Sequence, residues 1–194
     1  ADWAIALGPI GWDLYGARVP YSWFFGAAAK AVENRSIPQF GTGPFLYCAD
    51  AAALKADLER SAAACQEAER IGDASLAAEA RVIDGYLRML RAIVDLGAAN
   101  GKDKELSEQQ KQDAGAAMAV LDAATSQVAD GLRAWHEAVA PGAMPSRLQD
   151  TIDVTEQTCA DIGKYLGSLG VADPGRPYRR QTVGTWATED FAES

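Results

Sequence analysis

The sequence predicts an all-α fold, an up-down-up-down four-helix bundle with an irregular N-terminal arm and an irregular C-terminal tail. Alanine dominates the middle of the 194-residue chain and β-branched residues are sparse, which favours helix over sheet. Apolar residues recur in the same stretch at spacings of three and four, the period of a helix with one buried face. Glycine and proline crowd both ends and interrupt any helix there.

These patterns divide the chain into three regions. Residues 1–48 form the arm, in which a short helix is predicted over about 21–33. Residues 49–170 form the bundle, which we expect to close its core without the arm, and residues 171–194 form the tail. The length suits one domain, and we find no internal repeat.

The first long helix is predicted from about residue 49 to residue 71. Gly72 suits the left-handed position past a helix end, and Asp73 suits the N-cap of the next helix. The residues of this helix predicted to face the core are Ala51, Leu54, Leu58, Ala62 and Cys65.

The second helix is predicted to end near Gly97, ahead of a polar loop at 100–104. Its apolar residues alternate spacings of four and three, the pattern of a bundle seam. These residues are Leu76, Ala80, Ile83, Leu87, Leu90 and Val94.

The third helix is predicted to begin at a capping box made by Ser107 and Gln110 and to end before Pro141. It repeats the seam pattern over a longer stretch. The predicted core-facing residues are Ala114, Met118, Leu121, Thr125, Val128, Leu132, Trp135 and Val139.

The fourth helix is predicted to begin at a second capping box, made by Ser146 and Gln149, and to end at Gly170. Because short loops join all four helices, successive helices should pack antiparallel. The predicted core-facing residues of the fourth helix are Leu148, Ile152, Thr155, Cys159, Ile162, Leu166 and Leu169.

The composition argues against several classes of function. A net charge of −9 without a Lys/Arg stripe argues against nucleic-acid binding, and the longest uncharged apolar stretch, 19–29, is too short to span a membrane. His136 is the only histidine, and we read it as a favourable charge beside a helix C-terminus. We find no catalytic constellation, no metal-ligand set and no cofactor motif, which predicts a protein that is not an enzyme.

The three cysteines are predicted to be reduced thiols. Cys48 and Cys65 lie at opposite parts of one predicted helix, too far apart to bond. Cys65 and Cys159 fall on different helices at different heights in an antiparallel arrangement. Small buried apolar groups are the expected description of these side chains.

The aromatic residues gather in the arm, which holds 10 of the 16 Trp, Tyr and Phe residues of the chain. An irregular segment of this composition buries its aromatic rings either on its own bundle or on another protein. The tail adds a basic pair and a tryptophan. The residues predicted to dock on a partner are Trp3, Trp12, Tyr15, Tyr21, Trp23, Phe24, Phe25, Arg179, Arg180 and Trp186.

Several short sequences between residues 80 and 170 resemble those of the PsbQ-type extrinsic proteins of photosystem II, including the PsbQ-prime kind. They are Tyr86-Leu87-Arg88, the Lys-rich loop at 102–104, Leu106-Ser107-Glu108, and the closing run Tyr165-Leu166-Gly167-Ser168-Leu169-Gly170. The resemblance covers about half of the chain, from Ala80 to Gly170.

The resemblance implies a protein of the thylakoid lumen in a plastid. It would dock on photosystem core subunits or other extrinsic subunits and support the oxygen-evolving centre without ligating its metals. The chain departs from the family in its acidic charge and in its 24-residue tail. Two other functions stay open: a bundle that carries a pigment or lipid between its helices, and an enzyme whose site is built from scattered carboxylates.

Overall fold

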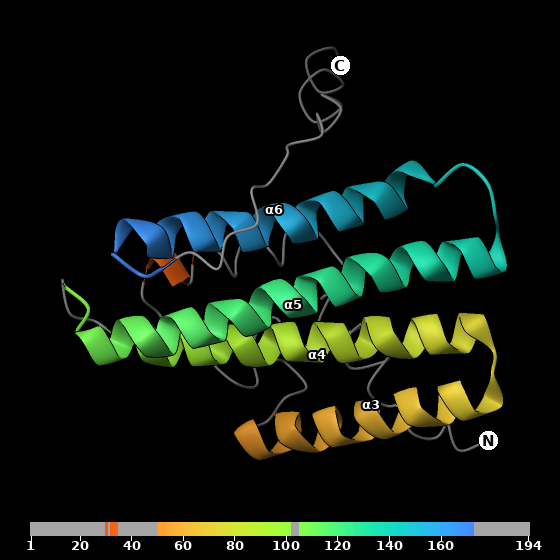
Figure 1. Ribbon diagram of the computed structural model, residues 1–194, viewed down its shortest axis with the longest axis horizontal. Helices are drawn as coiled ribbons and strands as arrows, with labels where there is room; N and C mark the ends of the chain where they lie inside the picture. The colour runs from red at the N-terminus through yellow and green to blue at the C-terminus, as the bar shows by residue number, and fades with distance from the viewer. Residues whose placement is uncertain (1–29, 31, 35–49, 102–104, 173–194) are drawn as a thin grey trace, which may run out of the picture.

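Figure 1 shows the fold in a computed structural model, which describes residues 30, 32–34, 50–101 and 105–172. The described residues form helices and their connections, and none of them forms a strand. The arm is described only where it approaches the bundle, where residues 32 and 33 are helical, within the predicted short helix.

Four long helices run up, down, up and down in chain order, as Figure 1 shows, which confirms the predicted bundle. Extensive contacts join each helix to the next one along the chain, so that the second and third helices form the centre and the first and fourth flank them. The helices are α3 (Ala51–Ile71), α4 (Ala74–Asn100), α5 (Glu108–Val139) and α6 (Ser146–Ser168).

The central helices α4 and α5 approach each other closely at two glycines. A Cβ atom added to Gly85 would lie 2.7 Å from Cγ2 of Val128, and one added to Gly131 would lie 2.7 Å from Cγ2 of Val82. Real side chains do not tolerate such distances, so only glycine permits this spacing of the two helices. The α4–α5 pair is therefore tightly packed, with no room for a ligand between the helices at these two levels.

Most of the predicted helix ends are confirmed. Gly72 and Gly170 adopt left-handed backbone angles, with φ of 78° and 80°, at the ends of α3 and α6. Asp73 accepts backbone hydrogen bonds at the start of α4. Ser107 and Gln110 form both hydrogen bonds of the capping box that begins α5.

The capping box predicted for α6 is wrong. Ser146 is already the first helical residue, and Pro145 occupies the N-cap without a side-chain hydrogen bond. The amide Nε2 of Gln149 instead donates to Oδ1 of Asp153, at 2.8 Å. Proline has no side-chain acceptor, so the first N–H groups of α6 receive no hydrogen bond from the N-cap side chain.

The predicted end of α4 near Gly97 is also wrong, because the helix continues to Asn100. Gly97 is buried within it, and Asn100 is fully buried rather than part of a polar loop. The helix stops at Gly101, which has a positive φ of 53°.

The core predicted on α4, α5 and α6 is largely confirmed. Leu76, Ile83, Val94 and Leu132 are partly buried against it. The predicted residues that are buried are Ala80, Leu87, Leu90, Ala114, Met118, Leu121, Thr125, Val128, Ile152, Thr155, Cys159, Ile162 and Leu166.

The prediction fails at the end of α5, where Trp135 and Val139 are 38% and 47% exposed and His136 is buried instead. A strict seven-residue repeat drifts by about 20° per heptad around a straight helix. Over the three heptads from Ala114 to Trp135 this drift moves the repeat off the buried face. The seven-residue repeat therefore describes the buried face of α5 correctly in its first part and fails at Trp135 and Val139.

The buried face of α3 agrees with the prediction at Leu54, and Leu58 and Cys65 pack against the core, but the fully buried face is otherwise different. The residues that α3 buries are Leu54, Asp57, Ser61, Ala64 and Ala68. Ala51 is exposed, and Leu58, Ala62 and Cys65 are only partly buried. Two of the buried residues are polar, so the apolar pattern alone pointed to a neighbouring face of the helix.

Among the described residues, the arm and the tail each contribute one side chain to the core. Val32 is 2% exposed and Val171 is 4% exposed. The backbone N–H of Val171 donates to the carbonyl of Leu166, at 3.1 Å, in the pattern that closes a helix after a left-handed glycine. The expectation that the bundle closes its core without the arm is therefore wrong at Val32.

Candidate functional site

The residues predicted to dock on a partner all lie outside the described residues, in the arm and the tail. Their docking role stays a prediction. They are Trp3, Trp12, Tyr15, Tyr21, Trp23, Phe24, Phe25, Arg179, Arg180 and Trp186.

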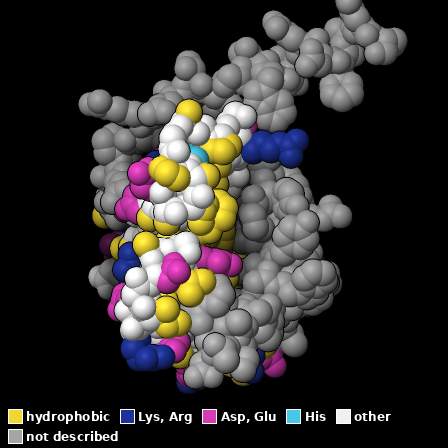
Figure 2. Space-filling model, turned by 90° about the vertical axis from the view of Figure 1, so that its right-hand side faces the viewer, with side chains coloured by type: hydrophobic (Ala, Val, Ile, Leu, Met, Phe, Trp, Pro, Cys, Tyr) yellow, Lys and Arg dark blue, Asp and Glu magenta, His cyan; other side chains and the backbone are white. Residues whose placement is uncertain are grey.

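The described helices carry an exposed apolar end. Ile71, Trp135 and Val139 are 46%, 38% and 47% exposed, and they lie in the last turns of α3 and α5, which both end on the same side of the bundle. Figure 2 faces this side and shows hydrophobic side chains at the surface among charged ones. We call Ile71, Trp135 and Val139 the apolar end.

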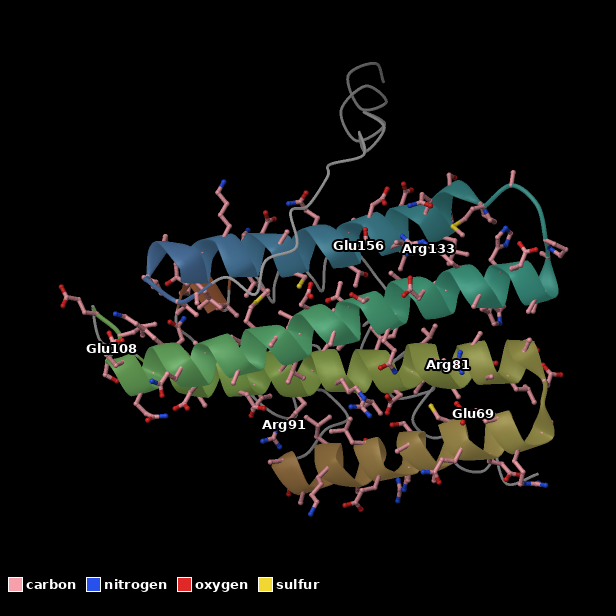
Figure 3. The ribbon with its side chains drawn as sticks, viewed as in Figure 1. Glu69, Arg81, Arg91, Glu108, Arg133 and Glu156 are labelled. Carbon is pink, nitrogen blue, oxygen red and sulfur yellow. The ribbon has the colours of Figure 1, made fainter. Side chains whose placement is uncertain are left out.

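Ion pairs tie the outer helices to the central ones beside the apolar end. Nη2 of Arg133 on α5 lies 3.2 Å from Oε1 of Glu156 on α6, and Nη2 of Arg81 on α4 lies 3.4 Å from Oε1 of Glu69 on α3. Figure 3 shows both pairs bridging neighbouring helices. Exposed pairs of this kind contribute little to stability, about 0–1 kcal/mol, but they neutralise charge around the apolar residues.

His136 is buried just inside the apolar end. Nε2 of its ring lies 3.3 Å from the carbonyl oxygen of Gly142, to which a ring N–H can donate. The imidazole thus ties the last turn of α5 to the connection that follows it. This contact gives His136 a packing role beyond the predicted interaction with the helix terminus.

A buried carboxylate joins three helices in the middle of the bundle. Asp84 on α4 is 4% exposed. Its Oδ1 accepts from the hydroxyl of Ser61 on α3, at 2.8 Å, and its Oδ2 accepts from Nε2 of Gln127 on α5, at 2.8 Å. Nε of Arg88, one turn along α4, donates to the same Oδ2, at 2.6 Å.

Both oxygens of the Asp84 carboxylate accept hydrogen bonds in this arrangement, which gives the group a structural role. Every partner is a donor fixed by its own helix, which is the requirement for burying a charge. We call Ser61, Asp84, Arg88 and Gln127 the Asp84 network. It specifies how α3 and α5 sit on α4, and it explains why α3 turns a polar face inward.

Cys65 lies on α3 near the Asp84 network and is a free, partly buried thiol. Burial, and next the negative charge of Asp84, raise the pKa of the Cys65 thiol to about 11. The thiolate is the nucleophilic form, so a raised pKa makes this cysteine unreactive at neutral pH. Cys65 therefore does not have the properties of a catalytic nucleophile.

We expect Cys65 to react slowly with iodoacetamide in the folded protein. At pH 8 a thiol with a pKa of about 11 holds roughly a hundredfold less thiolate than an ordinary cysteine, and the rate should keep rising up to about pH 11. Peptide-level mass spectrometry after timed alkylation measures this rate, with the protein in denaturant as control. Equal rates in the folded and denatured protein would contradict the assignment.

Tyr86 is a further buried polar group, between α4 and α6. Burial raises the pKa of its hydroxyl, and a hydrogen bond with Thr155 works in the opposite direction. A phenol is already neutral at physiological pH, and the raised pKa of Tyr86 extends the neutral range further into the alkaline region.

Neither a metal site nor a membrane span is found in the described part of the chain. No three His, Cys, Asp or Glu side chains within it come together as ligands for a metal ion. No described helix combines the length and the apolar character needed to cross a bilayer.

The sequence contained one signal for the Asp84 network that hydrophobic periodicity overlooks. Asp84 stands within the otherwise apolar run from Val82 to Leu87, where a carboxylate is either exposed or buried with partners. The sequence contains no comparable signal for the exposure of the apolar end, because that exposure depends on where the apolar repeat of α5 rotates away from the buried face.

Comparisons of the chain with protein-family models, curated proteins and solved structures found no match.

Proposed function

We propose that this protein is a non-catalytic extrinsic subunit that docks on a photosynthetic complex, most specifically on the core or the other extrinsic subunits of photosystem II in the thylakoid lumen. The observation that carries the docking part of the proposal is the apolar end. Exposed aromatic and aliphatic residues, here at the C-terminal ends of α3 and α5, are typical anchors of protein interfaces. The choice of complex rests on the resemblance of four short sequences to PsbQ-type proteins.

The chemistry of the described residues agrees with a structural role. The Asp84 network is internally satisfied, and the thiol of Cys65 has a raised pKa. Both arrangements stabilise or fill the bundle rather than expose a reactive group. The aromatic residues of the arm and the basic pair of the tail are the other contacts that we propose for the partner.

The pigment- or lipid-carrying function is weakened by the packing of the central helices. Gly85 and Gly131 bring α4 and α5 together at two levels, which removes the space that a carrier of this kind would need between them. We therefore propose the docking function alone.

Reconstitution on photosystem II preparations stripped of their extrinsic subunits tests the proposal. We expect the full chain to rebind, and Trp135→Ser combined with Val139→Ser to weaken binding by at least about thirtyfold, because the loss of even one interface anchor costs about 2 kcal/mol or more. Val120→Ser is the matched control, since Val120 is 47% exposed on the same helix but lies far from the apolar end.

Two results would contradict the proposal in different ways. Failure of the unaltered chain to bind any photosynthetic complex would remove the proposed partner. Binding by the Trp135 and Val139 variant with full affinity would remove the apolar end as the contact surface and leave the arm and the tail.

A further inference from the structure

The described part of the arm, residues 30 and 32–34, is held at the side of the bundle opposite the apolar end. Nδ2 of Asn100, the last residue of α4, donates to the carbonyl oxygen of Val32, at 2.8 Å. The hydroxyl of Tyr165, in the last turn of α6, donates to the carbonyl oxygen of Glu33, at 3.1 Å. The side chain of Val32 is 2% exposed and belongs to the hydrophobic core.

The two hydrogen bonds serve a definite chemical need. The last carbonyl groups of a helix have no partner within that helix. Residues 32 and 33 end a helical turn, in which the N–H of Asn34 donates to the carbonyl of Lys30, at 2.8 Å. Asn100 and Tyr165 supply the missing donors from two other helices.

The position of Asn100 indicates that this contact is specific. Its side chain is fully buried, and no hydrogen bond to its Oδ1 is found among the described residues. An unsatisfied buried oxygen is unfavourable, and an apolar side chain at this position would not have one. Burial of an amide here is therefore favourable only if its N–H donor makes a hydrogen bond. The only use found for it in the described part of the chain is the carbonyl of Val32.

We propose that Asn100, Tyr165 and the core site of Val32 form a latch whose occupant is the chain's own segment 30–34. The latch fixes this part of the arm across the ends of α4 and α6, helices that have few direct contacts with each other. Residues 32–34 leave these contacts only when both hydrogen bonds and the Val32 contact break together. This proposal concerns the arm itself and does not depend on any partner.

Limited digestion of the full chain with trypsin tests the latch. A protease cleaves only a segment that has left its folded contacts, so the rate of cleavage after Lys30 reports the opening of the latch. We expect Tyr165→Phe, which removes only the hydroxyl, to accelerate this cleavage about fivefold. Tyr165→Phe combined with Asn100→Ala should accelerate it about 25-fold, because each deleted hydrogen bond shifts the opening equilibrium by a similar factor.

Ser168→Ala is the matched control. Its hydroxyl donates to the carbonyl of Tyr165, at 2.6 Å, within the same turn of α6 and without touching the segment. Cleavage after Lys30 should keep its original rate in this variant, and cleavage after Arg91, in the middle of α4, should stay slow in every variant. Cleavage after Arg91 in the Asn100→Ala variant would show that the bundle itself has opened. The rate of cleavage after Lys30 in Tyr165→Phe then tests the latch by itself.

Two outcomes would overturn the proposal. One is cleavage after Lys30 at the original rate in Tyr165→Phe and in the double variant. The other is equal acceleration by Ser168→Ala, which would assign the effect to fraying of α6.

Discussion

Leu121→Ala is expected to lower the free energy of unfolding by about 2–5 kcal/mol. Leu121 lies in the middle of α5 and is 1% exposed. The substitution removes buried methyl groups and leaves a cavity that the surrounding helices close only in part. Ile162→Ala on α6, also 1% exposed, should lose a similar amount.

Val120→Ala is the control for Leu121→Ala, because Val120 is the preceding residue and is 47% exposed. It should change the stability by less than about 0.5 kcal/mol. Urea unfolding followed by circular dichroism measures all three variants. Similar small effects at positions 120, 121 and 162 would show that the core is assigned to the wrong faces.

Asp84→Ala is expected to lower the free energy of unfolding by about 3–4 kcal/mol. The substitution leaves Ser61 and Gln127 without their acceptor inside the bundle, and hydrogen bonds to a charged group are worth about 1.5–3 kcal/mol each without being additive. Arg88 adds less, because its side chain is 49% exposed and can turn to water.

Asp95→Ala offers the matched control on the same helix. Asp95 also pairs with an arginine one turn away, Arg91, at 2.9 Å, but both side chains are more than 40% exposed. Its loss should change stability by less than about 1 kcal/mol. If thermal or urea unfolding gives equal losses for the two variants, the Asp84 network does not hold the three helices together.

The sequence predicted those parts of the fold that depend on local rules. Helical periodicity placed most buried residues of α4, α5 and α6 correctly, because each of these helices buries an apolar stripe. Glycine and serine chemistry located three helix ends, at Gly72, Ser107 and Gly170. These features need only neighbours in the chain.

The errors arose where a distant segment decided the outcome. The inward face of α3 includes the polar Ser61, which donates to Asp84, a partner 23 residues away. Asn100 is buried in α4 rather than in a loop because it binds Val32, 68 residues away. Pairings of that kind follow from the packing of the helices, which no single-helix pattern contains.

The candidate docking residues divide in the same way. The excess of aromatic residues in the arm is visible in the composition, and their role stays a prediction. Trp135 and Val139 were predicted to face the core, and their exposure emerged only from the three-dimensional arrangement. Amphipathic patterns identify residues that avoid water, and they do not distinguish a core from an interface.

The glycine contacts between α4 and α5 show an internal pseudo-symmetry that is too short to stand out as a sequence repeat. Both helices contain the sequence V-x-D-G, at residues 82–85 and at residues 128–131. The valine of each helix faces the glycine of the other. Two antiparallel helices with such reciprocal contacts are related by a local two-fold axis.

These reciprocal contacts limit which residues can occupy four positions, 82, 85, 128 and 131. A larger residue at Gly85 can be accommodated only if Val128 becomes smaller, and the same holds for Gly131 and Val82. In related chains that keep this helix pair, residues 85 and 128 should therefore change together, independently of residues 131 and 82. The two correlated pairs would mark the conserved spacing of the central helices even where the rest of the sequence has diverged.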